Sequence, residues 1–183
     1  MSAPPFFIAC ITLIIVSFFS DHSRHRSPFI LSSLLIVVVG LVMVITIPLH
    51  NIPGRYIGLI ILLSSTLIPS PITVAWLAGN TPEPGKRTLV LGVNGWGNVG
   101  GIIGSEIFLP QYGPDYRWPL RVTLGLVAVS FVGYSICVLA FVFVNRWKRK
   151  MLRGMTIEEL EEEDSIGDGE RYADKKLTFI YGL

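Results

Sequence analysis

Hydrophobic residues in this chain form five long runs separated by short polar connections. Four runs hold no charged residue, and they cover residues 3–20, 28–48, 56–78 and 122–144. A fifth, weaker run covers residues 88–109, is rich in glycine and includes one glutamate. Because a helix of about 20 apolar residues crosses a bilayer, the pattern predicts about five transmembrane helices. The short connections predict an all-α membrane bundle of antiparallel neighbours, with no soluble domain between the spans.

Two of these runs carry a further signal. The first run could be a signal peptide, but its positive charges follow the apolar stretch instead of preceding it, so a membrane span is the favoured interpretation. In the third run, Pro69 and Pro71 each lack a backbone N–H and interrupt the helical hydrogen bonds. Neighbouring hydroxyl groups can bond to the freed carbonyls, so we expect a kinked helix there.

The distribution of lysine and arginine predicts which side of the membrane each connection occupies. These residues gather in the connections 21–27 and 79–87 and in the polar tail, residues 146–183. The positive-inside rule therefore places the tail and both connections in the cytoplasm. Residues 1–145 form the membrane bundle, and the tail follows them along the chain. The basic cluster at the start of the tail is either an ordinary stop-transfer signal or a contact for anionic headgroups.

The remainder of the tail is rich in acidic residues. Thr156 and Glu159 have the spacing of a capping box, which predicts the start of a short helix. Because charged residues dominate this stretch, we expect a solvated segment of low stability.

Composition narrows the class of protein. Hydrophobic residues make up 51% of the chain and charged residues 15%, against about 25% charged residues in soluble domains. The net charge of +2 is too small for a nucleic-acid-binding surface. Cys10 and Cys137 both lie in apolar runs, which gives neither a disulfide framework nor metal-ligand spacing. The sequence contains no catalytic motif, so we expect neither an enzyme nor a bound cofactor or metal.

The weakest run carries the most polar chemistry. Asn94, Asn98, Gly101 and Ser105 follow one another at spacings of four, three and four residues, which places them near one stripe of a helix. Amides in hydrocarbon are costly unless they are paired or hydrated. The stripe therefore either lines a water-filled cavity or bonds to neighbouring helices, and residue chemistry leaves both interpretations open.

The same run holds pairs of small residues and one carboxyl group. Gly97 with Gly101, and Gly100 with Gly104, have the small-xxx-small spacing that lets helices pack closely in lipid. Glu106 is the candidate proton site, because a desolvated carboxyl group has a raised pKa and can carry a proton. Its place near the end of the run also fits a solvated residue at the rim.

Three motifs carry a resemblance to a known family. They read PITVAWLAGNTPEPGKR, NGWGNVGGIIGSEIF and GPDYRWPL, between residues 71 and 120. They resemble the fungal anion:cation symporter family of the major facilitator superfamily, the allantoate permease group. The closing residues, GDGERYADKKLTFIYGL, resemble the cytoplasmic tail of such permeases. The connection DHSRHRS, residues 21–27, resembles the charged loop between helices eight and nine of the superfamily.

This resemblance implies that the chain corresponds to helices 8–12 of a twelve-helix transporter in the plasma membrane. Members move small organic anions, such as a ureide or a vitamin carboxylate, with protons by alternating access. The resemblance implies a substrate path along Asn94, Asn98, Ser65 and Thr66. It also implies a cytoplasmic gate, formed by Asp21, Arg24 and Arg26.

The missing helices of the family pattern leave a second hypothesis. Without the first half of the transporter, the chain is not expected to carry a substrate alone. Met1 is then expected to be an internal methionine of a longer protein. The alternative is a truncated membrane protein that does not transport, but interacts with full-length permeases. Under both hypotheses the chain contacts the lipid bilayer. It binds a small organic anion and a proton only when the first half of the transporter is present.

Overall fold

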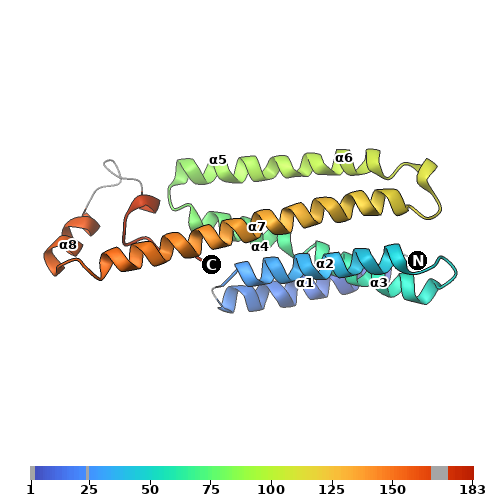
Figure 1. Cartoon of the computed structure of the whole chain (residues 1–183), viewed down its shortest axis with the longest axis horizontal. Coiled ribbons are helices and arrows are strands. Elements are labelled where there is room, and N and C mark those ends of the chain that lie inside the picture. Colours follow the sequence, from blue (N-terminus) through green and yellow to red (C-terminus); the bar gives the residue numbers. More distant parts are fainter. Residues whose placement is uncertain (1–2, 24, 166–172) are drawn as a thin grey trace.

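A computed structural model describes residues 3–23, 25–165 and 173–183 of the chain, and every regular element in these ranges is helical (Figure 1). Three of the elements are short 3-10 turns, labelled η1 to η3. The elements are α1 (Ala3–Ser23), α2 (Ser27–Thr46), α3 (Ile52–Thr66), α4 (Pro69–Asn80), α5 (Pro84–Gly95), η1 (Trp96–Val99), α6 (Gly100–Ile107), η2 (Pro110–Tyr112), α7 (Arg117–Leu152), α8 (Ile157–Ser165) and η3 (Ala173–Lys175).

Four of the described helical stretches are long and apolar enough to cross a membrane. They are α1, α2, the pair α3–α4 and α7. Figure 1 shows them side by side, with the α1–α2 and α4–α5 connections at the end that also holds α8, here called the tail end. The structure thus confirms the all-α membrane class, and it puts at one end the segments that the charge pattern assigned to one side.

The fifth predicted span, residues 88–109, is not a single helix. It is divided between α5 and α6, which the turn η1 separates and which run along one line beside α7 in Figure 1. Gly95 and Gly97 flank Trp96 at this break, and glycine is a poor helix former because it loses much backbone freedom on folding. Neither α5 nor α6 contains a buried residue.

The third predicted span is broken, as its prolines indicate. Helix α3 ends at Thr66 and α4 begins at Pro69. Pro69 has no backbone N–H, so it cannot donate a hydrogen bond to the preceding turn. The hydroxyls of Ser65 and Thr66 donate to the carbonyls of Ile61 and Leu62 at 2.6 and 2.7 Å, so the chain before the break bonds to its own backbone.

Helix α2 supplies the buried centre of the bundle. Its buried residues recur every three or four positions, which puts them on one stripe. Ile30 and Leu34 pack with Ile72 and Trp76 of α4 in one cluster, while a second cluster joins α2 to Leu120 of α7. Because α2 contacts α3, α4 and α7, its position determines how these helices are arranged.

Close contact between α2 and α3 depends on glycine at position 40. A Cβ atom at Gly40 would lie 2.9 Å from the backbone nitrogen of Leu62 and 3.0 Å from its Cα atom. Backbone atoms of a packed helix cannot move aside as a flexible side chain can. The two helices can therefore approach this closely only because residue 40 has no side chain.

The end of the chain differs from the solvated tail that its composition predicts. Helix α7 continues to Leu152, and the end of the membrane bundle at residue 145 stays a prediction. The predicted capping box is confirmed, because the Thr156 amide donates to Glu159 at 2.7 Å and α8 follows. This bond lowers the pKa of the Glu159 carboxyl group. Residues 174–183 then return toward the bundle and pack on α4 and α7.

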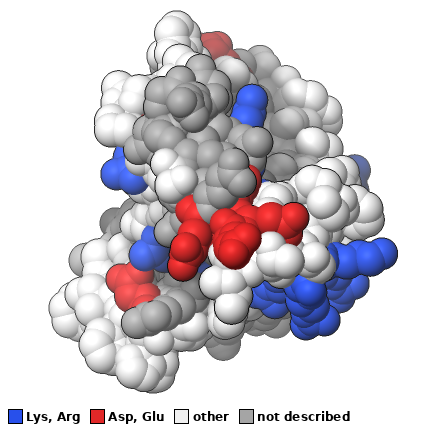
Figure 2. Space-filling model, turned by 90° about the vertical axis from the view of Figure 1, so that its left-hand side faces the viewer, with Lys and Arg blue, Asp and Glu red and all other residues white. Residues whose placement is uncertain are grey.

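Charged side chains separate by sign at the tail end. Figure 2 looks onto this end and shows acidic side chains gathered in its middle, with a group of basic side chains to one side. The exposed residues of each sign come from neighbouring helices: Glu158, Glu159 and Glu161 from α8, and Arg146, Arg149, Lys150 and Arg153 from the end of α7 and the turn after it.

Candidate functional site

A pocket of about 600 Å³ lies between the broken helix and the α5–η1 segment. Residues of α2, α3, α4, α5, η1 and α7 line it. They are Leu34, Thr66, Pro69, Ser70, Thr73, Val74, Leu91, Asn94, Gly95, Gly97 and Tyr134. None of these lining residues is charged, and their polar groups are hydroxyls and one amide. Such a lining can bind a small polar solute through neutral hydrogen bonds, next to an apolar wall.

The hydroxyl groups of the pocket come from both sides of the α3–α4 break. Thr66, Ser70 and Thr73 are spaced by four and three residues. Thr73 is buried, and its hydroxyl shares a hydrogen bond with the hydroxyl of Tyr134 from α7. Either oxygen can be the donor, so this pair can offer a solute a donor or an acceptor.

Two of the four residues predicted on the substrate path line this pocket, and their role in transport stays a prediction. Asn94 and Thr66 both line it, and Asn94 is exposed at the end of α5. Ser65 is buried, donates to its own helix and is not among the lining residues. The backbone of Asn98 belongs to η1, but its side chain lies outside the described part of the structure.

The other residues predicted on the fifth run lie away from the pocket or at its margin. Glu106 is an exposed residue of α6 and is not among those that line the pocket. Gly97 lines the pocket, whereas Gly100, Gly101 and Gly104 do not. A Cβ atom at any of these four glycines would meet no other atom within 4 Å in the described chain, so their role in helix packing stays a prediction.

The predicted gate forms one ion pair in the structure. Arg26 contacts Asp21 at 3.1 Å, while Arg24 lies outside the described residues. The Asp21 side chain is 69% exposed, and exposed ion pairs contribute little, about 0–1 kcal/mol. Arg26 and Asp21 also line a smaller pocket of about 260 Å³ together with Trp76, Asn80 and the last two residues of the chain. The gating role therefore stays a prediction.

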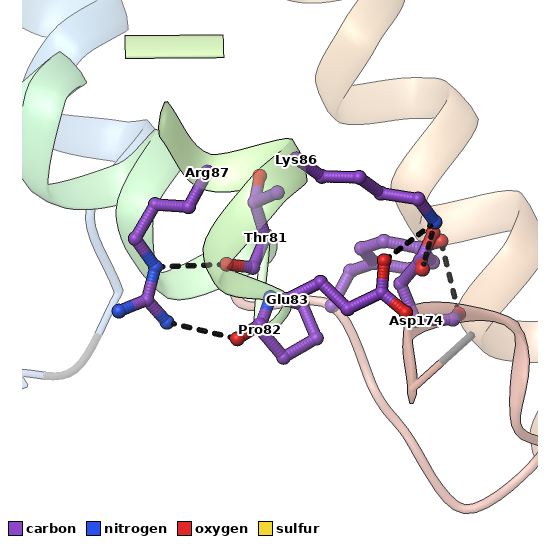
Figure 3. A network of polar contacts seen from close by, with 7 residues as sticks. Thr81, Pro82, Glu83, Lys86, Arg87 and Asp174 are labelled. Carbon is purple, nitrogen blue, oxygen red and sulfur yellow. Dashed lines mark hydrogen bonds and ion pairs between the residues drawn. The ribbon is translucent and has the colours of Figure 1, made fainter. Parts of the chain in front are cut away.

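A polar network joins the α4–α5 connection to the end of the chain (Figure 3). Lys86 of α5 bonds to the Asp174 carboxylate at 2.7 Å and to that of Glu83 at 3.5 Å. The hydrogen bond to Asp174 raises the pKa of Lys86 above its ordinary value. Arg87 points the other way and donates to the carbonyls of Thr81 and Pro82, which fixes the turn before α5.

Sequence reasoning missed three polar residues of the pocket. Ser70 and Thr73 continue the helical spacing that begins at Thr66, so extending that stripe past the prolines would have found them. Tyr134 gave no local signal, because it lies in a uniformly apolar run and reaches the pocket only through the packing of α7.

The bond between Thr73 and Tyr134 leads to a stability prediction. Thr73→Val and Tyr134→Phe should each lower the free energy of unfolding by about 1–2 kcal/mol, because each leaves a buried partner unpaired. The double variant should be little worse than either single one, since the same bond is lost. Thermal unfolding in mild detergent measures these effects, and Ser130→Ala, an exposed hydroxyl of α7, is the control. Additive losses would show that the two hydroxyls act independently.

The chain is similar over nearly its whole length to transporters of fungi. It is 30% identical over 182 residues to the high-affinity nicotinic acid transporter of Saccharomyces cerevisiae, an alignment that covers 99% of this chain and 33% of that protein. It is 32% identical over 158 residues to the MFS-type transporter efuF of Hormonema carpetanum, covering 84% of this chain and 31% of the relative. The major facilitator-type transporter hxnP of Emericella nidulans is 29% identical over 147 residues, 79% of this chain and 28% of the relative.

All three relatives are named as transporters, two of them as transporters of the major facilitator type, and together with the apolar helices they indicate an integral membrane protein. The chain spans about a third of the length of the curated relatives that it matches. No protein-family model matches the chain, and no solved structure matches it.

Proposed function

We propose that this chain forms part of a transporter of the major facilitator superfamily that carries a small organic anion by alternating access. The observation that carries the proposal is the similarity to fungal transporters over 99% of the chain. The pocket between α4, α5 and α7 supports it, because secondary transporters bind their solutes between helices near the middle of the membrane. The tail end would face the cytoplasm, with the plasma membrane as the location of the whole protein.

The lining of the pocket suggests how an anion would be held there. Asn94 offers an amide donor, and Ser70 and the Thr73–Tyr134 pair offer hydroxyls. A carboxylate accepts several such hydrogen bonds, and bonds to a charged acceptor are about twice as strong as neutral ones. A proton carried on Glu106, or on a group of the remaining helices, would couple uptake to the proton gradient.

The substrate class follows from the same reasoning. The Saccharomyces cerevisiae relative is named as a transporter of nicotinic acid, which is a small aromatic carboxylic acid. We therefore propose a vitamin or ureide carboxylate for this chain, and assign it to the allantoate permease group within the superfamily. The ring of Tyr134, which lines the pocket, would provide an apolar surface for a planar solute.

Uptake by the complete protein tests this function. Cells that lack their own nicotinic acid carrier and express the complete protein should accumulate labelled nicotinic acid, and a proton uncoupler should abolish the accumulation. A panel of competing ureides and carboxylates then ranks the substrates. Absence of uptake for every compound, from protein that reaches the cell surface, would contradict the proposal and favour the alternative of a protein that interacts with permeases.

Variants of the predicted path refine this experiment. Asn94→Leu and Asn98→Leu should each reduce uptake about tenfold or more at unchanged surface expression, because a solute bonded to the amide would lose a charge-assisted hydrogen bond. Val93→Leu is the matched control, since Val93 is exposed on the same helix and does not line the pocket. Equal uptake by Asn94→Leu and Val93→Leu would remove Asn94 from the path.

A further inference from the structure

The last ten residues of the chain, Asp174–Leu183, begin in η3 and the turn after it, and then run across α4 and α7 at the tail end. We call this segment the strap. Two asparagines hold its backbone. Asn145 of α7 donates to the carbonyl of Tyr181 at 2.8 Å and accepts from its amide at 2.9 Å. Asn80 of α4 bonds in the same way to the carbonyl and amide of Gly182, at 3.1 and 2.7 Å. Each asparagine thus pairs with both backbone polar groups of one residue, as a neighbouring strand would.

A buried lysine adds a charge to this attachment. The Lys148 side chain of α7 is 4% exposed. Its ammonium group donates to the carbonyls of Asp174, Lys176 and Phe179 at 2.9, 2.8 and 2.9 Å, which uses its three hydrogens. It also stands 4.9 Å from the centre of the Tyr181 ring. An ammonium group without such partners is costly to bury, so the strap and Lys148 stabilise each other.

Further bonds tie the strap to other segments. Trp76 of α4 donates from its indole nitrogen to the carbonyl of Gly182 at 2.9 Å. The amide of Arg26, between α1 and α2, donates to the carbonyl of Leu183 at 2.7 Å. Lys86 reaches Asp174 from the start of α5 (Figure 3). The strap therefore connects α7 to α4, to α5 and to the α1–α2 connection.

Aromatic side chains continue from the strap to the wall of the pocket. The Tyr181 ring stacks on Phe141 of α7, with centroids 4.6 Å apart, and Phe141 lies 5.3 Å from Trp76. Trp76 in turn contacts Tyr134, which lines the pocket and bonds to Thr73. A displacement of the strap would remove support from each ring in turn, because packed side chains change position together.

In the described part of the chain, α4 is held at its two ends, by its packed face and by the bond between Thr73 and Tyr134. One end follows the break at Leu67 and Ile68, where the helix of α3 stops. The other end holds Trp76 and Asn80, which bond to the strap. Breaks of this kind are where helices absorb rotations during conformational changes. Helix α4 thus has a hinge at the break before it and hydrogen bonds to the strap at its other end.

We propose that the strap is a lock on α4: while it is docked, α4 is held against α7, and when it is released, α4 pivots at the break and widens the pocket, which uncovers the buried Thr73. The lock requires only that the strap docks and leaves, and it does not depend on which solute the pocket takes. The docked and released states differ in the contacts of Asn80, Asn145 and Lys148. These contacts contribute to the free-energy difference between the two states, which a partner or a modification would have to change in order to release the strap.

Hydrogen–deuterium exchange on the complete protein tests the docking. In the unmodified protein the amides of Tyr181, Gly182 and Arg26 should exchange slowly, because each donates to the bonded partner described above. Lys148→Met should speed their exchange about tenfold or more, whereas Lys150→Met, an exposed lysine of the same helix, should not. Gly182→Pro removes one donor within the strap itself and changes no residue of a helix. It should speed the exchange of the Tyr181 and Arg26 amides as Lys148→Met does.

The accessibility of the pocket tests the lock. With Cys10 and Cys137 replaced by serine, a Thr73→Cys substitution places a thiol on the buried, pocket-lining side of α4. Its reaction with a water-soluble maleimide should become at least about fivefold faster in Gly182→Pro and in Lys148→Met than in Lys150→Met. Fast strap amides in the unmodified protein would overturn the docking. Unchanged thiol reactivity after the strap amides become fast would overturn the lock, while leaving the transport proposal intact.

Discussion

The Trp76→Ala substitution is expected to cause the largest loss of stability among single changes in this chain. Trp76 is 6% exposed and packs with Ile30, Leu34 and Ile72 in the buried cluster that joins α2 to α4. Replacing a buried tryptophan by alanine costs about 3–5 kcal/mol, because apolar area and dispersion contacts are lost and a cavity remains. A folded protein is stable by only about 5–15 kcal/mol, so the variant should be close to unfolding.

The loss at Trp76 has a second component, which Trp76→Phe separates. The indole nitrogen donates to Gly182 in the strap at 2.9 Å, a bond that phenylalanine cannot make. Trp76→Phe should therefore keep most of the stability and release the end of the strap. The temperature of half-aggregation in mild detergent measures both variants. Trp96→Ala is the control, since Trp96 is 76% exposed, and an equal loss in both alanine variants would contradict the central place of Trp76.

The Gly40→Leu substitution is expected to separate α2 from α3. The first carbon of any side chain at this position would already meet backbone atoms of Leu62 at 2.9 and 3.0 Å. Excess volume in a packed core costs about 1–3 kcal/mol and more where the obstacle is backbone, so we expect a loss of roughly 3 kcal/mol or more. Because α2 is the helix on which α3, α4 and α7 pack, the strain should spread to all of them.

A matched change on another helix isolates this effect. Gly133 lies on α7, and a Cβ atom there meets nothing within 4 Å in the described chain. Gly133→Leu adds the same volume and the same helix-forming residue, and it should leave the melting temperature nearly unchanged. Yield of monodisperse protein after detergent extraction, followed by thermal unfolding, compares the two variants. Similar behaviour of both would mean that α2 and α3 do not approach as closely as the structure describes.

The amino-acid sequence by itself determined most of the helices and the break between α3 and α4, but not the break between α5 and α6. Long apolar runs gave the spans, the prolines at positions 69 and 71 gave the break between α3 and α4, and Thr156 with Glu159 gave the start of α8. These features depend on hydrogen bonds between residues three or four positions apart and on transfer from water to lipid. Both are readable from neighbouring residues, so no knowledge of the packed structure was needed.

The tertiary structure alone decided which polar groups meet. Thr73 and Tyr134 are 61 residues apart, and Trp76 and Gly182 are 106 residues apart. Composition predicted a solvated tail because it cannot register that Asn80, Asn145 and Lys148 present bonding partners to the strap on adjacent helices. Composition also could not distinguish Gly40 from the glycines of the fifth run. A side chain at Gly40 would meet the backbone of α3, whereas a Cβ atom at those other glycines would meet nothing within 4 Å in the described chain. Such contacts depend on how helices cross, and the crossing is settled by packing in three dimensions instead of by local propensity.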